Sequence, residues 1–263
     1  MKQDQIWFAV ISLVLVFSAR VSQAASDILP LERVEVPVAH VFVPPQGYDD
    51  NDNIQLVLDG TLPNACYKVA DNSIRLNKET QEIRAQLYAD RKIDGDCADP
   101  RQIPPSLQAP VPFTVEVSVG KLSWGQYQVV YKDSATNQRS RTFVVEKAQK
   151  RDVDNVPYAA ISSVWINDTV PSGSAIEATI VGSLTSTCAY LTPEVVIKKM
   201  DDIFVVLQGQ SVRPNLICAF MLVPFQRTLQ LGTADEGRYL IHARSMNGNA
   251  VNHAFSVVMA KTK

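Results

Sequence analysis

The chain of 263 residues contains an internal repeat, and this repeat restricts the possible folds more than any other feature of the sequence. Residues 54–145 contain a series of landmarks that returns in the same order in residues 176–257. The landmarks are Gly60, Cys66, Cys97, Phe113, Val117, Val119, Gly120, Gly125, Tyr127, Val129 and Phe143, and then Gly182, Cys188, Cys218, Phe225, Leu229, Leu231, Gly232, Gly237, Tyr239, Ile241 and Phe255. Such repetition indicates two copies of one folding unit. We therefore expect two domains, at 34–148 and 157–260.

Both copies consist mainly of short segments in which apolar and polar residues alternate. Phe113, Val115 and Val117, for example, alternate with polar residues, and a period of two with one apolar face indicates a half-buried strand. We expect seven strands per copy, near residues 36–44, 53–60, 66–76, 81–91, 112–120, 126–133 and 140–147, and near 160–167, 175–182, 188–199, 202–209, 224–231, 238–245 and 250–259. The predicted fold is all-β, with two tandem seven-stranded β-sandwiches.

The repeat also predicts how the four cysteines pair. Their even number favours disulfides in an oxidising compartment, and one cysteine pair per copy gives Cys66–Cys97 and Cys188–Cys218. If successive strands alternate in direction, both cysteines of a pair lie at the same pole of their sandwich. A zinc site built from all four cysteines is the alternative, but the chain lacks a Cys-x-x-Cys knuckle. We expect two disulfides, no metal and no cofactor.

The first residues resemble a secretory signal peptide. Lys2 precedes an apolar run from Ile6 to Phe17, and Ser22-Gln-Ala24 offers small residues for cleavage after residue 24. A retained anchor is the alternative, although the run is short for a bilayer core, and we expect no membrane span after cleavage. Without residues 1–24 the net charge is −3, which argues against a nucleic-acid partner and against polybasic membrane attachment. The predicted location is secreted or periplasmic.

A short motif links the two copies to a known superfamily. Leu122-x-x-Gly125-x-Tyr127, repeated as Gly237-x-Tyr239, is close to the tyrosine corner of Greek-key sandwiches. Here the chain resembles the immunoglobulin-like superfamily, and it is nearer to fibronectin type III domains than to antibody domains. The resemblance implies an immunoglobulin-like sandwich in each copy. The cysteines depart from the antibody pattern, because they lie in loops.

Loops and exposed aromatic residues provide the candidate binding residues. The 94–110 loop is longer than its counterpart and carries Asp94, Asp96 and Asp99 around Cys97; extended loops on rigid scaffolds often bind. Trp124 lies in a turn where the second copy has Glu236, and Tyr48 is predicted to lie in a loop. Both are candidate anchors for a partner, with packing over the end of the sandwich as the alternative for Trp124. Trp165 aligns with Phe42, and we expect it to pack in the core.

Two further clusters raise the question of a metal site. The tract Asp49-Asp-Asn-Asp-Asn53 offers oxygen ligands for calcium, but it lacks the glycine and the distal glutamate of an EF-hand loop, and we expect a solvated turn. A two-residue turn at Asn247-Gly248 would place His242 directly opposite His253. The register implied by the repeat instead places the two histidines on opposite sides of the sheet, and we favour that register.

No motif for nucleophilic or phosphate chemistry is present, and three histidines offer few general bases. We therefore expect a non-catalytic protein that acts in binding, adhesion or scaffolding and has a protein or glycan partner. The alternative is a periplasmic chaperone-like protein that holds a partner strand at an exposed sheet edge. Against this alternative, pilus chaperones are not built from close repeats, and we find no basic pair that matches their anchoring residues.

Overall fold

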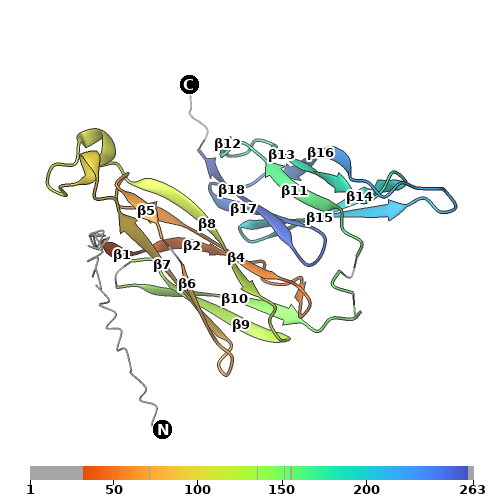
Figure 1. Cartoon of the computed structure of the whole chain (residues 1–263), viewed down its shortest axis with the longest axis horizontal. Helices are drawn as coiled ribbons and strands as arrows, with labels where there is room; N and C mark the ends of the chain where they lie inside the picture. Colours follow the sequence, from red (N-terminus) through yellow and green to blue (C-terminus); the bar gives the residue numbers. More distant parts are fainter. Residues whose placement is uncertain (1–31, 71, 135, 151, 155, 260–263) are drawn as a thin grey trace, which may run out of the picture. The chain divides into compact units, whose positions relative to one another are not determined.

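Strands make up most of the part of the chain that the structure describes. The computed structural model describes residues 32–70, 72–134, 136–150, 152–154 and 156–259, so the predicted signal peptide lies outside the described residues. The first half contains β1 (Arg33–Val36), β2 (Val38–Phe42), β3 (Tyr48–Asp49), β4 (Ile54–Leu62), β5 (Tyr67–Val69), β6 (Ser73–Asn77), β7 (Glu82–Arg91), β8 (Val111–Gly120), β9 (Gly125–Lys132) and β10 (Gln138–Glu146) (Figure 1). The second half contains β11 (Ala160–Trp165), β12 (Thr169–Pro171), β13 (Ile176–Leu184), β14 (Ala189–Met200), β15 (Ile203–Val212), β16 (Val223–Gly232), β17 (Gly237–Arg244) and β18 (Ala250–Val258). Two short 3-10 turns, η1 (Gly95–Cys97) and η2 (Pro105–Leu107), lie between β7 and β8, and the described residues include no α-helix.

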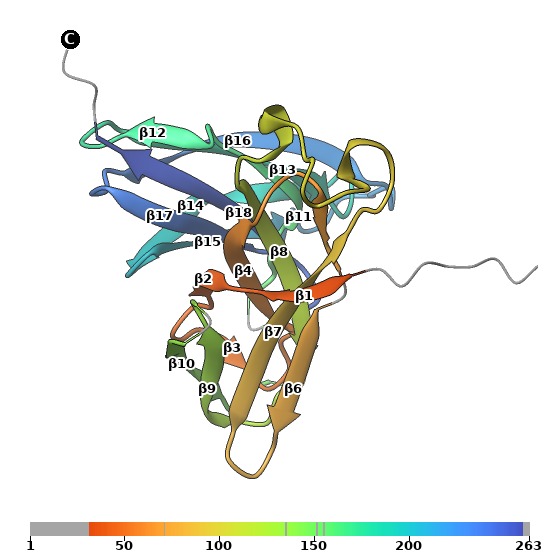
Figure 2. The same ribbon diagram turned by 90° about the vertical axis from the view of Figure 1, so that its left-hand side faces the viewer.

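Each half is a sandwich of two sheets around an apolar core, which confirms the predicted all-β fold. In the first half, β2-β4-β8 faces a larger sheet ordered β1-β7-β9-β10-β3, with β5 and β6 also paired to β7. Figure 2 turns this half toward the viewer. In the second half, β11-β13-β16 faces the sheet β12-β18-β17-β15-β14. Alternate residues of the strands point inward, and both sheets contribute to each core.

The order of the strands departs from the immunoglobulin-like pattern. In immunoglobulin constant-type domains the third, sixth and seventh strands share one sheet, and the fourth lies in the other. Here the strand in the fourth predicted position, β7 or β15, pairs in parallel with the sixth, β9 or β17. The third position pairs with the fourth instead, as β6 with β7 and β14 with β15. The resemblance therefore gives the sandwich architecture correctly and the strand order incorrectly.

The structure reproduces the repeat down to its irregularities. A register shift lies between Ile54 and Gln55 and returns between Ile176 and Glu177. The repeated glycines have a steric reason. A Cβ added to Gly60 would lie 2.6 Å from Cζ of Phe113, and one added to Gly182 would lie 2.8 Å from Cζ of Phe225. In each half, the phenylalanine ring therefore occupies the space above the glycine.

The predicted tyrosine corners and disulfides are both confirmed. The Tyr127 hydroxyl donates to the carbonyl of Ser123 and the Tyr239 hydroxyl to that of Asp235, each at 3.0 Å. Cys66 is bonded to Cys97 and Cys188 to Cys218, each with a Cα–Cα distance of 5.5 Å. Each disulfide joins two connections that run from one sheet to the other, and both connections lie at the same pole of their sandwich.

The two halves share a third apolar cluster. Phe42 and Val57 of the first half pack with Ile203, Val205 and Leu240 of the second, and all five side chains are buried. The described residues all belong to one compact unit. The boundaries 34–148 and 157–260 remain predictions: the strands of the two halves lie in separate sheets around separate cores, but the third cluster packs the halves against each other.

Candidate functional site

The acidic tract after β3 is not the solvated turn that we expected from the sequence. Asp52 is only 1% exposed, and its carboxylate forms an ion pair with the guanidinium of Arg244 on β17. Its second oxygen accepts a hydrogen bond from the backbone N–H of Asp49 at 2.9 Å. The prediction was wrong because the partner of Asp52 lies 192 residues later in the chain. The tract fixes the first half to the second.

Two further arginine–aspartate pairs join the halves. Arg238 donates to Asp59 from Nε at 3.0 Å and from Nη2 at 2.9 Å, which is the bidentate geometry of a strong charge-assisted pair. Arg141 of the first half donates to Asp202 of the second at 2.8 Å. The arginine belongs to the second half in two pairs and to the first half in one. These contacts surround the shared apolar cluster and hold the halves in a fixed arrangement.

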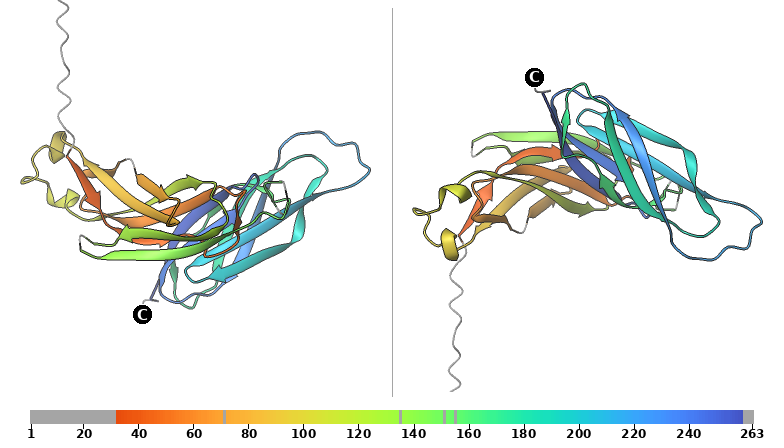
Figure 3. Two further views of the ribbon diagram at one scale, coloured as in Figure 1. Left: turned by 90° about the horizontal axis from the view of Figure 1, so that it is seen from below. Right: turned by 90° about the horizontal axis from the view of Figure 1, so that it is seen from above.

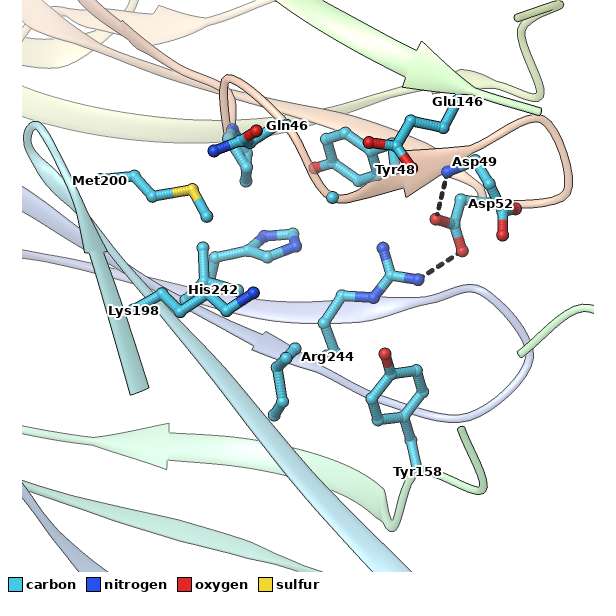
Figure 4. A pocket seen from close by; sticks show the side chains of 14 residues that line it. Gln46, Tyr48, Asp49, Asp52, Glu146, Tyr158, Lys198, Met200, His242 and Arg244 are labelled. Carbon is cyan, nitrogen blue, oxygen red and sulfur yellow. Dashed lines mark hydrogen bonds and ion pairs between the residues drawn. The ribbon is translucent and has the colours of Figure 1, made fainter. Parts of the chain in front are cut away.

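A pocket of about 230 Å³ lies at this junction. Figure 4 shows Tyr48 above His242 and Arg244, with Lys198 and Met200 from β14 on one side. Its lining comes from both halves and comprises Pro44, Gln46, Gly47, Tyr48, Asp49, Asp52, Glu146, Tyr158, Lys198, Met200, Val205, Leu207, His242 and Arg244.

His242 is a buried titratable group in the lining of this pocket. Its Nδ1 lies 2.8 Å from Oδ1 of Asn252, whose amide nitrogen donates to Glu116 at 2.7 Å. Because that amide is oriented as a donor to Glu116, Oδ1 is the acceptor and Nδ1 carries the proton. Nε2 is buried without a hydrogen-bond partner. Burial, and then the charge of Arg244, lower the pKa of His242 to about 4, so the ring is neutral near pH 7.

Tyr48 is buried, not in an exposed loop as predicted. It forms β3, which pairs in parallel with β10, and its ring lies edge-on to His242 with 5.7 Å between centroids. The guanidinium carbon of Arg244 lies 5.6 Å from the ring centroid of Tyr48 and 5.5 Å from that of Tyr158. Burial opposes the charge of Arg244, but the hydrogen bond and charge of Asp52 outweigh burial and raise its pKa. The two rings and the carboxylate thus stabilise one buried cation.

The two histidines lie on opposite sides of the sheet, as the repeat predicted. Ile241 pairs with His253 and His242 with Asn252. The observed register is therefore shifted by one residue from the register that would place the two histidines opposite each other. The hairpin closes through the Ser245 N–H and the Asn249 carbonyl at 2.9 Å, which leaves three residues in the turn instead of two. No group of three histidine, cysteine, aspartate or glutamate side chains suited to a metal ion occurs in the described ranges.

The other candidate residues do not form one site. Asp94 and Asp96 are exposed near the disulfide, and Asp99 is half-buried, with its carboxylate accepting from the backbone N–H of Arg101 at 2.8 Å. Trp124 is 64% exposed in the turn between β8 and β9. Since β8 runs from one pole to the other, Trp124 lies at the opposite pole from the acidic loop. The structure therefore separates Trp124, the acidic loop and the buried Tyr48.

Trp165 is exposed, contrary to the prediction that it packs in the core. It pairs with Thr179 as Phe42 pairs with Val57, so the two aromatic residues occupy equivalent positions of the repeat. Phe42 is fully buried by the second half, whereas Trp165 is 65% exposed. Equivalent sequence positions differ because only the first copy has the other half against that face.

A group of exposed large apolar side chains that are close together in the chain was missed by sequence reasoning. It lies at the end of β15 and in the connection from β15 to β16, and we name it the apolar tip; its exposed members are Val212, Leu216, Ile217, Phe220, Met221 and Leu222. Figure 3 shows this connection projecting beyond the ends of the neighbouring strands. The sequence signal is the apolar run from Leu216 to Val223 between two prolines, in the place where the first copy has an acidic loop.

The fold alone does not require an apolar tip. The two connections occupy equivalent places in the repeat, and each is tied down by a disulfide. The first carries polar and acidic residues, whereas Phe220 in the second is 97% exposed and Ile217 is fully exposed. Contiguous exposed apolar patches commonly mark interaction surfaces. The apolar tip is therefore the strongest candidate contact surface on the described residues.

Comparisons of the chain with protein-family models, with characterised proteins and with solved structures gave no match. Among the described residues, no helix has the length and apolar character needed to cross a membrane.

Proposed function

We propose that the chain is a secreted or periplasmic, non-catalytic binding protein whose contact surface is the apolar tip. The observation that carries the proposal is the exposure of five large apolar side chains on a loop held by the Cys188–Cys218 disulfide, with a sixth, Val212, at the end of the strand before it. Apolar side chains that remain in water contribute no hydrophobic stabilisation to the fold. A partner that covers them would remove this apolar surface from water, which favours binding. The all-β fold and the two disulfides are compatible with this function outside the cytoplasm.

The junction between the halves supports a passive scaffold. Each of its three arginines is matched by an aspartate, and breaking the buried pair of Arg244 and Asp52 would be costly. A junction of this kind suits a protein that presents its loops on a fixed frame. His242 and Tyr48 beside the pocket are therefore assigned a structural role in this proposal.

Strand addition at a sheet edge is the alternative, and β14 is the longest edge strand among the described residues. This strand exposes Tyr190 and Val196. It is also interrupted by Pro193 and by a register shift between Leu191 and Val195. Proline and bulges are the features by which proteins block pairing at edges. We therefore place the contact at the apolar tip.

Site-specific photo-crosslinking in the native host tests this proposal. A photoreactive residue at position 220 should capture an envelope component, whereas the same residue at position 165, another exposed aromatic position on a different surface, should capture little. Efficient capture from position 165 or from β14 positions, with none from position 220, would contradict the assignment. Migration of the uncrosslinked protein without reductant verifies that both disulfides are intact.

A further inference from the structure

We propose that the apolar tip inserts into the outer part of the hydrocarbon layer of one leaflet of a lipid bilayer, so that the protein docks on a membrane surface without crossing it. This inference rests on the proposed binding function and names the chemistry of the partner.

The form of the tip favours a fluid partner over a shaped one. Ile217 and Phe220 are exposed over essentially their whole side chains, and Leu222 is 69% exposed. They project from a connection that extends past the ends of β15 and β16 (Figure 3). A bilayer can surround side chains that are exposed over their whole surface, whereas a protein partner would need a complementary cavity. Amphipathic segments that lie in membrane interfaces bury their apolar side chains in this manner.

The composition of the tip points in the same direction. Its exposed members are valine, leucine, isoleucine, phenylalanine and methionine, without tyrosine or tryptophan. The aliphatic residues and phenylalanine have favourable transfer energies into the hydrocarbon region. Protein-binding hot spots are instead enriched in tryptophan, tyrosine and arginine.

The charges around the tip suit an anionic surface. The sequence from Ile203 to Ala234 contains no aspartate or glutamate, and its charged residues are Arg213 and Arg227. Arg213 stands at the base of the tip with its guanidinium carbon 5.9 Å from the ring centroid of Tyr190. A basic side chain beside an apolar insertion adds attraction to anionic headgroups. The equivalent loop of the first half carries Asp94, Asp96 and Asp99, which such headgroups would repel.

Vesicle flotation tests the proposal with the full chain, expressed with its leader and purified in the form that the host exports. The probes are vesicles of phosphatidylcholine alone and of phosphatidylcholine mixed with phosphatidylglycerol. We expect binding to both, and tighter binding to the anionic vesicles at low salt. The double variant Ile217→Ser/Phe220→Ser should lower vesicle binding by about tenfold or more, since it removes two large apolar side chains.

Trp124→Ser and Trp165→Ser are the matched controls, because each removes an exposed aromatic side chain elsewhere on the molecule. Both should float like the unmodified protein. All variants keep the same N-terminus, so any contribution of that segment is common to them. Unchanged thermal unfolding of the double variant separates loss of binding from loss of fold.

Three results would overturn the lipid assignment. The unmodified chain could fail to bind either vesicle, or the double variant could bind as well as the parent. Sedimentation could also show a concentration-dependent dimer that the double variant abolishes, in which case the occupant of the tip is a second copy of the chain. If vesicles are not bound but position 220 still crosslinks to an envelope protein, the proposed function stands and only the lipid partner is wrong.

Discussion

His242 makes the stability of the protein depend on pH in a predictable direction. The folded ring has a pKa of about 4 because it is buried beside Arg244, whereas an unfolded histidine titrates near 6.5. Between these values the unfolded chain binds a proton that the folded chain excludes. Stability therefore falls as the pH falls below about 6.5, and this contribution reaches its limit once the folded ring also becomes protonated.

The linkage relation gives the size of this loss. With the two pKa values above, His242 alone removes about 2 kcal/mol from the free energy of unfolding between about pH 8 and pH 5. Other groups titrate in the same range, so the informative quantity is the difference between the parent and a variant that lacks the imidazole. His242→Asn keeps a donor toward Asn252 and removes the titration.

Urea unfolding measured at several pH values between about 8 and 5 tests the prediction. The parent should lose about 2 kcal/mol more than His242→Asn over this range, whatever the stability of the variant at neutral pH. His253→Asn is the control for the loss of an imidazole, because His253 lies on the opposite side of the sheet from His242, where its ring faces Asp168 and not the pocket. Equal slopes for the parent and His242→Asn would refute the placement of a buried, neutral ring at position 242.

Four further substitutions test the junction and the repeat by chemical unfolding. Asp52→Asn should lower the free energy of unfolding by about 3–5 kcal/mol, because it leaves the guanidinium of Arg244 buried without its counter-charge; a change below about 1 kcal/mol would show that the pair is open to water. Phe42→Ala should cost about 3–5 kcal/mol and Trp165→Ala less than about 1 kcal/mol, and similar costs would contradict the different burial of these equivalent positions. Gly182→Ala should cost about 1–3 kcal/mol, since the added carbon would lie 2.2 Å from the carbonyl oxygen of Ala160; no loss would mean that β11 can move away.

Local patterns and the repeat predicted much of the fold. Alternation gave the strands, because the side-chain period of a strand is a local property. The repeat predicted the disulfide pairs and the register of the last hairpin, because each copy served as a check on the other: a pairing or register was accepted only if it fitted both. The tyrosine corners followed from a three-residue motif whose hydrogen bond spans four residues in each half.

The order of the strands was decided only in the tertiary structure. The sequence pattern of β7 and β15 shows which side chains face inward, but not which neighbour accepts their backbone hydrogen bonds. The parallel pairing with β9 and β17 joins segments that are distant in sequence. Patterning therefore predicted a sandwich and could not distinguish this strand order from the immunoglobulin-like one.

For the candidate site too, the sequence showed the residue types and the tertiary structure decided which of them are buried. Within the sequence, Asp52 belongs to an acidic tract, Tyr48 to a loop beside glycine, and Trp165 to a strand position equivalent to that of Phe42. Their burial depends on which surface of the other half lies against them, and residues about 190 positions away supply that surface to Asp52. The apolar tip is visible in the sequence as an apolar run, but its exposure depends on the tertiary structure, in which no described element covers it.

The sequence by itself determined the strands, the disulfides and the repeat, because these follow from local periodicity and internal comparison. The tertiary structure alone decided which polar groups are buried and which apolar groups remain in water, because burial is a property of contacts between distant segments.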